Sequence, residues 1–540
     1  MRNMYRTIAA LLIAVLLLAA LGCAENGGAI VGKDYNFKKT MRDGYPVTEH
    51  GTTLTVWAQI KTNLGSYGNY GETEFAKYLR EATGINVEYI HPPATQEDTS
   101  FTLMIASGSL PDIIGYRWGN YGNGGMAGAV LDNIAVPING ILENGGAPNL
   151  KKVLDGNPGW KKSIITDDNH IVMFPYIADE GLASYSGGMI RKDWLDSLGL
   201  DVPTTIDELE IVLRAFRGMG VKTPLSIDLQ NVMSPMVNAL TSGFGVGSEF
   251  YAEDGKIKYG PYEPGYKDFV GTMRKWYDEG LYDKEFAAAD YSKFSALIAR
   301  GDLGIAYGGN GGSWGEWLPA LYAANPQARL ASLPPFTAVK GQRAEFGHLE
   351  KIFQEFGSVI TTRCKDVELA AKLLDYGFSE QGSMLFNFGK EGEAYVMDGT
   401  QPKYTERLRD TDKNGGVSLS QAISYYCGTG YFGAPFVQDA RFMEEFYTIP
   451  EQRQNIKTWG DSNMARHLIP NLQYTAEEAR EVSRLTTDLQ TYKQESLYKF
   501  IAGVNRMEDY DGFLKTLESI GIQRALELQQ AAYDRYLRRE

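Results

Sequence analysis

The chain has 540 residues, too many for a single hydrophobic core, so we expect two or three lobes. It carries 67 acidic and 53 basic residues, which gives a formal net charge of −14. So acidic a surface repels both nucleic acid and anionic lipid, and we expect no nucleic-acid partner.

The N-terminus has the pattern of a secretory signal peptide covering 1–22. Arg2 and Arg6 form a short basic region, and 8–21 is an unbroken apolar run. This run is shorter than the roughly 18–20 residues that a membrane-spanning helix needs, and its length suits the core of a signal peptide. No later apolar stretch approaches spanning length.

The end of that run, 20–23, resembles the lipobox of bacterial lipoproteins, in which the final cysteine is acylated. The cysteine here is Cys23, and Ala20 stands where the lipoprotein pattern prefers leucine. The resemblance implies a lipid such as palmitate on Cys23, which would anchor the protein to the outer face of the cytoplasmic membrane through a tether, 23–50. An ordinary signal peptide with a cysteine at its boundary is the alternative.

The region that follows predicts alternating strands and helices. Strands are expected at 54–57, 85–90 and 113–114, and helices at 73–83 and 97–106. This β-α-β-α-β order is typical of a parallel, doubly wound sheet.

A second α/β unit follows downstream. Pro203 and the hydroxyls of Thr204 and Thr205 mark the start of a helix that runs to about 216. Further helices are predicted at 264–279, 291–300, 365–379, 476–502 and 510–537, and strands at 303–307 and 358–361. Their interleaving indicates two α/β lobes built from discontinuous segments.

Two cysteines lie beyond the lipobox, Cys364 and Cys427. Export permits a disulfide between them, whereas two thiols so far apart in sequence are more typical of separate buried residues, and both readings stay open.

Several segments form an ordered set along the mature chain. They are 106–113 (ASGSLPDI), 190–205, 369–376 leading into 379–382, 389–395 (GKEGEAY) and 531–536. Together they resemble the extracellular solute-binding proteins, family 1, of carbohydrate ABC importers, in a lipoprotein branch related to maltose- and alginate-binding proteins. Each segment alone is weak, but their order and spacing make the resemblance specific.

The resemblance implies an α/β, two-lobe, periplasmic-binding-protein-like type II fold whose discontinuous lobes are joined by crossover hinge segments. It places lobe one at 51–174 plus 356–400 and lobe two at 180–350 plus 405–540. Hinge closure would bring both lobes onto the solute, and a permease would recognise the closed form. The implied protein is a monomeric, lipid-anchored binding component that captures an oligosaccharide and delivers it to ABC permease subunits, with no cofactor, metal or catalysis.

Ligand-binding residues are expected among aromatic and polar side chains at strand ends. A sugar offers hydroxyls at its edges and C–H groups on its faces, so flat rings and planar hydrogen-bonding groups suit it. The candidates, which follow predicted strands or close a family segment, are Trp57, Tyr116, Arg117, Trp118, Asn120, Asn310, Trp314, Trp317 and Tyr395. The alternative is that these rings cover the lobe cores.

Two motifs point to other chemistry. The segment 311–315 matches G-x-S-x-G, the nucleophile elbow of α/β-hydrolases, with His348 and His467 downstream. Its glycine-rich approach is too flexible for a sharp elbow, and no His-Gly-Gly-Gly oxyanion segment exists, so hydrolysis is disfavoured. A half-match to a dinucleotide fingerprint at 122–127 does not lie at the first strand-to-helix turn, which favours a plain loop.

Calcium is considered at two places. The segment 410–418 resembles the start of an EF-hand loop, but Gln421 stands where the bidentate glutamate is required, and a polar surface loop is favoured. Alginate-type relatives carry an Asp/Asn-rich calcium loop at the position of 217–222, which lacks those residues here. The resemblance therefore carries over no metal site.

Two alternatives to transport remain. One is an exported carbohydrate-active enzyme that uses paired carboxylates, although no Asp/Glu pair lies in a segment resembling a glycosidase site. The other is a sugar-binding sensor or adhesin without transport.

Overall fold

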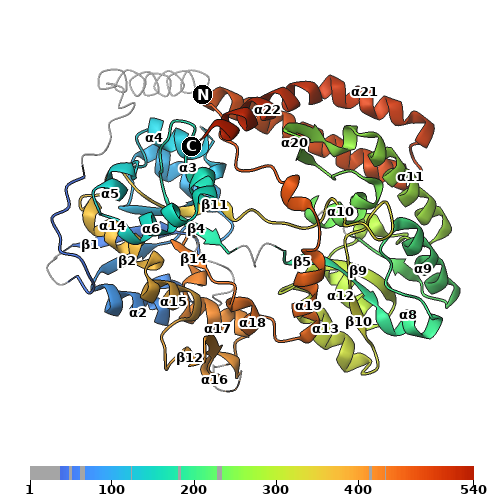
Figure 1. The fold of residues 1–540 in the computed structure, drawn as a ribbon, viewed down its shortest axis with the longest axis horizontal. Coiled ribbons are helices and arrows are strands. Elements are labelled where there is room, and N and C mark those ends of the chain that lie inside the picture. The colour runs from blue at the N-terminus through green and yellow to red at the C-terminus, as the bar shows by residue number, and fades with distance from the viewer. Residues whose placement is uncertain are drawn as a thin grey trace, which may run out of the picture.

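The computed structural model describes residues 37–47, 52–60, 67–122, 124–179, 184–227, 234–410, 412, 416–431 and 433–539. The expected signal peptide, Cys23 and residues 411 and 413–415 of the loop 410–418 lie outside these residues. Figure 1 shows two lobes side by side, each with a sheet covered by helices. Within the described ranges, no helix is both long and apolar enough to cross a membrane.

The first lobe is built on a six-stranded sheet with the order β14-β4-β11-β3-β1-β2. Its strands are β1 Thr53–Ala58, β2 Asn86–Ile90, β3 Ile113–Arg117, β4 Phe174–Ala178, β11 Phe353–Ile360 and β14 Phe436–Gln438. β1 lies parallel to β2 and β3, and β14 lies parallel to β4. β11 runs antiparallel to β3 and β4, so the doubly wound start expected from the sequence belongs to a mixed sheet.

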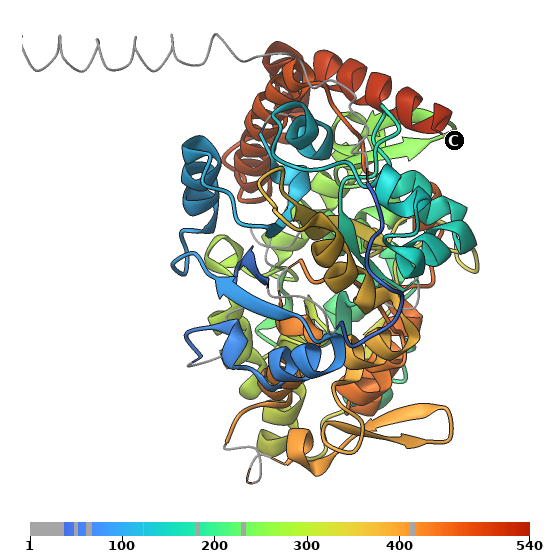
Figure 2. The ribbon, with the colours of Figure 1, turned by 90° about the vertical axis from the view of Figure 1, so that its left-hand side faces the viewer.

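Ten helices, together with α18 (Phe442–Phe446) described below, and a hairpin surround this sheet in the described part of the chain. The helices are α2 Glu74–Thr83, α3 Glu97–Ser107, α4 Gly125–Leu131, α5 Asn139–Glu143, α6 Pro148–Gly156, α7 Pro158–Ile164, α14 Val367–Asp375, α15 Glu380–Phe388, α16 Glu406–Arg409 and α17 Leu419–Tyr426. The hairpin joins β12 Tyr395–Asp398 to β13 Gln401–Tyr404, and Figure 2 shows it projecting from the body.

The second lobe is built on a four-stranded sheet with the order β10-β5-β9-β6. Its strands are β5 Ser186–Arg191, β6 Thr223–Leu225, β9 Leu303–Gly309 and β10 Leu330–Leu333, with a separate pair β7 Phe250–Glu253 and β8 Lys256–Tyr259. Its helices are α8 Lys192–Leu198, α9 Ile206–Gly218, α10 Ser234–Thr241, α11 Pro264–Glu279, α12 Tyr291–Ala299, α13 Ser313–Ala324, α19 Pro450–Trp459, α20 Ala476–Ile501, α21 Tyr510–Ile520 and α22 Ile522–Arg538.

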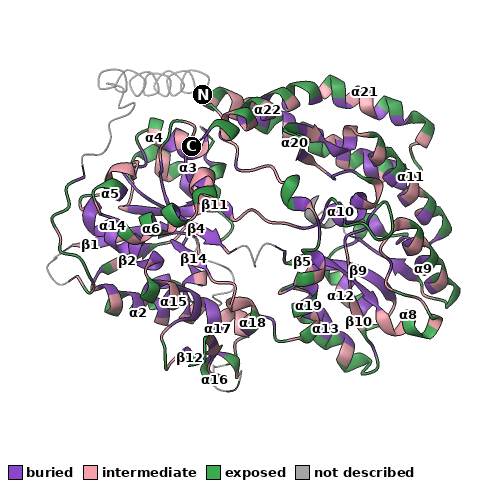
Figure 3. Cartoon of the chain, in the orientation of Figure 1, coloured by how far each residue is buried: buried purple, intermediate pink, exposed green. Residues whose placement is uncertain are grey.

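Each lobe has its own apolar core. Buried residues cover the inner faces of the sheets and helices, and exposed residues lie on the outer helix faces (Figure 3). The first core includes Phe75 and Ile113, and the second includes Phe269 and Trp276. Cys427 is buried and Cys364 half-buried, and both thiols are free.

The ends of the helices follow local signals. Thr73 caps α2 by accepting a hydrogen bond from the Ala76 N–H at 3.1 Å, and Thr205 caps α9 in the same way. The predicted helix 510–537 is instead two helices, α21 and α22. Gly521 separates them because its φ of 115° cannot continue a helix.

The lobe boundary differs from the expected one after residue 400. β14 pairs with β4 in the first sheet, so that Phe436 lies beside Tyr176. The next helix, α18 (Phe442–Phe446), is held there too, because the buried Glu445 carboxylate accepts a hydrogen bond from the Tyr404 N–H at 2.8 Å. Residues 405–446 therefore pack with the first lobe, whereas the sequence prediction assigns them to the second.

Candidate functional site

Among the described elements, the chain crosses between the lobes three times, between β4 and β5, between β10 and β11, and between α18 and α19. The first and second crossings lie side by side where they meet the first lobe, next to the end of β14. The Ala178 N–H donates to the Ile352 carbonyl at 2.8 Å, and the Asp179 N–H donates to the Gln438 carbonyl at 3.2 Å. Neighbouring crossings of this kind form a hinge that can absorb the backbone rotation of lobe closure.

A cavity of about 450 Å³ lies beside this hinge. Its volume is in the range of small-molecule binding sites. The cavity is lined by Tyr176, Tyr185, Gln354, Phe356, Ser420, Ile423, Ser424, Thr429, Tyr431, Gly433, Ala434, Phe436, Gln438, Phe442 and Phe446. The wall thus combines β4, β11, α17, β14 and α18 with one residue of the first crossing. We call it the hinge cavity.

Seven of the lining residues are aromatic. The rings of Phe442 and Phe446 stack with 5.2 Å between their centroids, and Tyr176 packs edge-on to Phe436 at 5.4 Å. Tyr176, Phe356, Phe442 and Phe446 are only half-buried. Partly open rings that lie side by side form the flat apolar surface that suits the C–H face of a sugar.

The polar part of the wall consists of carboxamides and hydroxyls. The Tyr176 hydroxyl donates to Oε1 of Gln438. The Ser358 hydroxyl, behind the wall, lies 2.9 Å from the Tyr431 hydroxyl and donates to the Gly433 carbonyl at 2.9 Å. Burial raises the pKa of Tyr176 and of Tyr431 well above the ordinary tyrosine value, so both stay protonated and able to donate.

Tyr185 connects the hinge cavity to the hinge itself. Its hydroxyl donates to Oε1 of Glu350 at 2.9 Å, and its ring packs edge-on to His348 at 4.8 Å. His348 lowers the pKa of Glu350, and the hydrogen bond from Tyr185 adds to that effect. Side chains therefore join the first crossing to the second at the mouth of the site.

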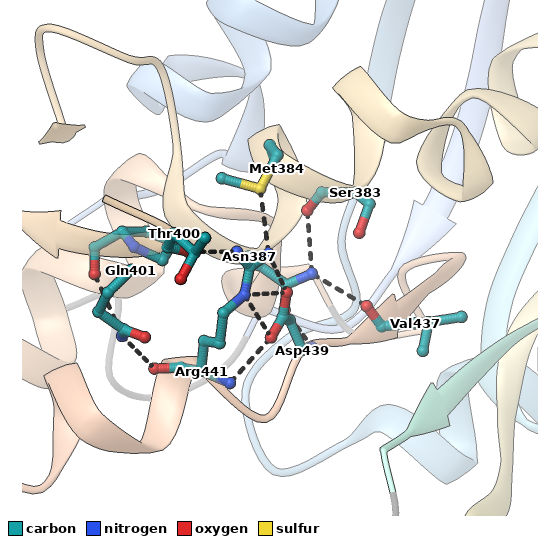
Figure 4. Close-up of polar contacts among 9 residues, drawn as sticks. Ser383, Met384, Asn387, Thr400, Gln401, Val437, Asp439 and Arg441 are labelled. Carbon is teal, nitrogen blue, oxygen red and sulfur yellow. Dashed lines mark hydrogen bonds and ion pairs between the residues drawn. The ribbon is translucent and has the colours of Figure 1, made fainter. Parts of the chain in front are cut away.

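Asn387 supports the wall from behind β14 (Figure 4). Its Nδ2 donates to the Val437 carbonyl at 2.9 Å, and its Oδ1 accepts from the Asp439 N–H at 2.8 Å. These two backbone groups lie at the free edge of β14, which is the outer strand of the sheet. Asn387 therefore fixes the strand whose Phe436 and Gln438 side chains line the hinge cavity.

Arg441 ties the same strand end to the β12–β13 hairpin. Its guanidinium pairs with Asp439 and donates to the Thr400 carbonyl at 2.8 Å. In return, Nε2 of Gln401 donates to the Arg441 carbonyl at 3.2 Å. The positive charge of Arg441 is thus paired outside the hinge cavity, whose lining includes neither Arg441 nor Asp439.

The ring candidates of the first lobe lie in its core. Trp57 is 5%, Tyr116 7% and Trp118 0% exposed. Phe101 stacks on Tyr116 with 3.8 Å between centroids and meets Trp118 edge-on at 5.7 Å. Tyr395 is likewise buried, at the base of the hairpin. In this structure these rings pack in the core and have no face open to a ligand.

The two polar candidates of the first lobe are exposed. The Arg117 guanidinium lies over the ring of Phe356, 4.3 Å from its centroid, and so touches one ring of the hinge-cavity wall. Asn120 lines a different cavity of about 740 Å³, between residues 119–125 and α20. None of the nine candidates lines the hinge cavity itself, but Arg117 contacts the lining residue Phe356, and the Asn310 N–H donates to the carbonyl of the lining residue Tyr185 at 2.7 Å.

The candidates of the second lobe are also buried. Trp314 and Trp317 lie on α13 with 1% and 3% of their surface exposed, and Nε1 of Trp314 donates to the Gly187 carbonyl at 3.2 Å. Asn310 is fully buried and donates from Nδ2 to the Gln452 carbonyl at 2.8 Å. Since these polar groups already have protein partners, we do not propose them as sugar contacts.

The residues that do line the hinge cavity escaped the sequence prediction. Tyr176, Phe356 and Phe442 come from segments that are far apart in sequence, and none of them follows a predicted strand end. The one local signal is the pair Phe442 and Phe446, spaced four residues apart as on one face of a helix.

The serine motif does not form a hydrolase site among the described residues. Ser313 is the first residue of α13, and no hydrogen bond in the described chain joins it to a histidine. The ring nitrogens of His467 contact the Ala252 carbonyl and the Glu345 carboxylate. The described ranges also contain no group of three or more His, Cys, Asp or Glu placed to hold a metal ion.

Two lobes, a hinge of three crossings and an aromatic cavity beside it are the architecture of a protein that captures a solute between its lobes. The sequence comparison leads to the same class. The chain belongs to the bacterial extracellular solute-binding proteins, whose family pattern matches residues 62–384. The family expected from the sequence is thereby confirmed.

Among curated proteins, the fructooligosaccharide ABC transporter substrate-binding protein FusA of Streptococcus pneumoniae is 26% identical over 501 residues, which cover 85% of this chain and 86% of FusA. Lipoprotein LipO of Bacillus subtilis is 31% identical over 252 residues, 42% of this chain and 45% of LipO. The polygalacturonan/rhamnogalacturonan-binding protein YtcQ of the same organism is 26% identical over 239 residues, 43% of this chain and 46% of YtcQ.

Solved structures share the fold. Alginate-binding protein AlgQ2 without calcium ion superposes with a TM-score of 0.69 at 22% identity, covering 90% of this chain and 99% of AlgQ2. An HMO-binding solute-binding protein from Bifidobacterium longum infantis reaches 0.71 at 18% identity, covering 92% of this chain and all of that one. The expected α/β two-lobe fold is confirmed.

Proposed function

We propose that this protein is the lipid-anchored substrate-binding component of an ABC importer, which captures an oligosaccharide in the hinge cavity and delivers it to the permease. The observation that carries the proposal is the wall of that cavity, where stacked rings lie beside carboxamides and hydroxyls at the hinge. Family membership and the relationship to FusA, a fructooligosaccharide-binding protein by its name, support the same reading.

Delivery follows from the hinge. Before closure, the wall belongs almost entirely to the first lobe, and Tyr185 at the start of β5 brings in the crossing to the second. A sugar that contacts both sides stabilises the closed arrangement by its difference in affinity for the two states. The permease then needs to recognise only the closed form, and the binding protein itself has no catalytic step.

The proposed anchor is Cys23, and its support is the lipobox-like sequence together with the lipoprotein relative LipO. Labelling of cells with a palmitate analogue tests it directly. The intact protein should be labelled and recovered with membranes, and Cys23→Ser should abolish both. Cys364→Ser is the matched control and should change neither; labelling that survives in Cys23→Ser contradicts the anchor.

Capture is tested by calorimetry and thermal shift on the mature chain with Cys23→Ser, against fructo-, malto-, xylo- and galacto-oligosaccharides and oligogalacturonate. A ligand at 100 times its Kd that binds only the native state should add about 2.7 kcal/mol to the free energy of unfolding. If no sugar binds and a reducing-end assay instead detects hydrolysis, the exported enzyme is the correct reading.

The position of the site has its own variant pair. Phe442→Ala removes one of the two stacked rings and should weaken sugar binding about tenfold or more, the equivalent of roughly 1.4 kcal/mol. Phe244→Ala removes an equally half-buried ring of the second lobe that does not line the hinge cavity and should leave affinity unchanged. Equal effects of the two variants would place the sugar elsewhere.

A further inference from the structure

The polar groups that line the hinge cavity are all neutral. They are the carboxamides of Gln354 and Gln438 and the hydroxyls of Ser420, Ser424 and Thr429, beside the tyrosines. Among the described residues of the lining, none is Asp, Glu, Lys, Arg or His. When a ligand enters this cavity, it replaces its contacts with water by contacts with neutral dipoles and ring faces. It gains no ion pair from the lining.

Charged groups next to the wall already have partners. Arg441 pairs with Asp439 behind β14, as Figure 4 shows. Glu350 accepts the Tyr185 hydroxyl and lies 3.6 Å from His348. Arg117 places its guanidinium over the ring of Phe356, 4.3 Å from the ring centroid. Charges of both signs thus surround the cavity, and those behind β14 and at the mouth are engaged with one another.

This arrangement should give neutral and acidic sugars different binding affinities. A hydroxyl exchanges its water for amide and hydroxyl partners at little net cost. A carboxylate would lose its hydration without gaining an ion pair from the lining residues, which weakens its binding in a partly buried site. The formal net charge of −14 also repels an approaching polyanion.

We propose that the hinge cavity selects uncharged sugar units and discriminates against the corresponding uronates. The proposal rests on the function proposed above and specifies its substrate class. It separates this chain from a binder of acidic polysaccharide, although proteins that bind alginate and polygalacturonan are among its relatives by their names.

The first test compares one sugar in two charge states. The neutral oligosaccharide that binds most tightly in the calorimetric panel is oxidised at its primary alcohols to carboxylates, and both forms are titrated into the mature chain. The acid should bind at least ~100-fold more weakly. Equal affinity for both forms, or oligogalacturonate as the tightest ligand of the panel, overturns the selectivity while the capture function stands. Failure of every sugar to bind overturns the proposed function itself.

The second test reverses the selectivity at one lining position. Gln354 is half-buried on β11, and Gln354→Lys places a cation of similar length in the wall. The ratio of acid to neutral affinity should rise about tenfold or more, because an opposite charge at short range favours the carboxylate. Gln354→Met has the same length without charge and should leave the ratio as it is. An unchanged ratio in Gln354→Lys overturns the proposal, since the sugar then does not meet this wall.

Discussion

Trp314 stabilises the protein through its buried contacts. It is 1% exposed, packs edge-on against Trp317 at 5.0 Å between centroids, and donates its indole N–H to the Gly187 carbonyl. Trp314→Ala should therefore lower the free energy of unfolding by about 3–5 kcal/mol, measured by urea denaturation of the unliganded chain. The half-buried Phe442→Ala is the comparison and should cost less. If the Trp314→Ala protein has normal stability but no longer binds sugar, Trp314 is a sugar-binding residue, as the sequence predicts.

The sequence around Trp314 contains a helical pattern of apolar residues that predicts its buried position. The glycine-rich segment before it predicts a loop, but α13 begins at Ser313, directly after those glycines. Trp314, Trp317, Leu318 and Leu321 are then spaced as one apolar helix face, and all four are buried. An amphipathic stripe is thus a better guide to tryptophan than nearby glycine.

The residues of the hinge cavity had no such signal. Tyr176 on β4 and Gln438 on β14 meet through a side-chain hydrogen bond across 262 positions of sequence. Their proximity depends on β14 returning to the first sheet, which neither strand specifies locally. A site made by long-range strand pairing is therefore invisible to periodicity and motif spacing, whereas its hinge and family were predictable.

At the scale of elements, local signals were sufficient where a helix has its own cap. The expected helix 264–279 is α11, with Pro264 in its first turn and Gly280 in the left-handed conformation at its end. β14 was missed because it has only three residues, too few for a periodic pattern. The error in the lobe boundary followed from that one strand.

β14 is also the element most dependent on side-chain support. Asn387 is fully buried, and its carboxamide bonds both the Val437 carbonyl and the Asp439 N–H. Asn387→Ala should lower the free energy of unfolding by about 1–3 kcal/mol, since buried backbone groups lose their partner, and should weaken sugar binding by releasing Gln438. Both quantities are measured on the same protein preparation by urea denaturation and calorimetry.

Gln401→Ala is the control for that variant. Gln401 belongs to the same network but is half-buried, and its side chain donates to the Arg441 carbonyl at 3.2 Å and to the Pro402 carbonyl at 3.4 Å. It should change stability by no more than about 0.5 kcal/mol and leave binding intact. Loss of stability in Asn387→Ala with unchanged affinity would show that β14 keeps its register without the asparagine.

The whole molecule is asymmetric about its hinge. The described residues 37–47 pack on the first lobe, where the Glu368 carboxylate accepts from the Thr40 N–H at 2.8 Å and Tyr45 donates to the Lys372 carbonyl at 2.7 Å. The proposed membrane tether therefore joins the body at the first lobe. That lobe also carries nearly all of the hinge cavity, so closure amounts to movement of the second lobe over an anchored site.

The C-terminal helix provides a link between the lobes that does not pass through the hinge. α22 belongs to the second lobe, and its end returns to the first, where Asp167 accepts from Nε of Arg535 and from Nε of Arg539, each at 2.8 Å (Figure 1). Asp167→Asn should lower the free energy of unfolding by about 1–3 kcal/mol, because the Arg539 side chain is almost fully buried and loses its charged partner. The neighbouring Asp168 is exposed, so Asp168→Asn should leave the free energy of unfolding unchanged.

The stability lost in Asp167→Asn should be the same at high salt, since screening acts weakly on a buried pair. A double-mutant cycle with Arg539→Met isolates the interaction, and a coupling energy near zero would show that α22 does not hold the lobes together.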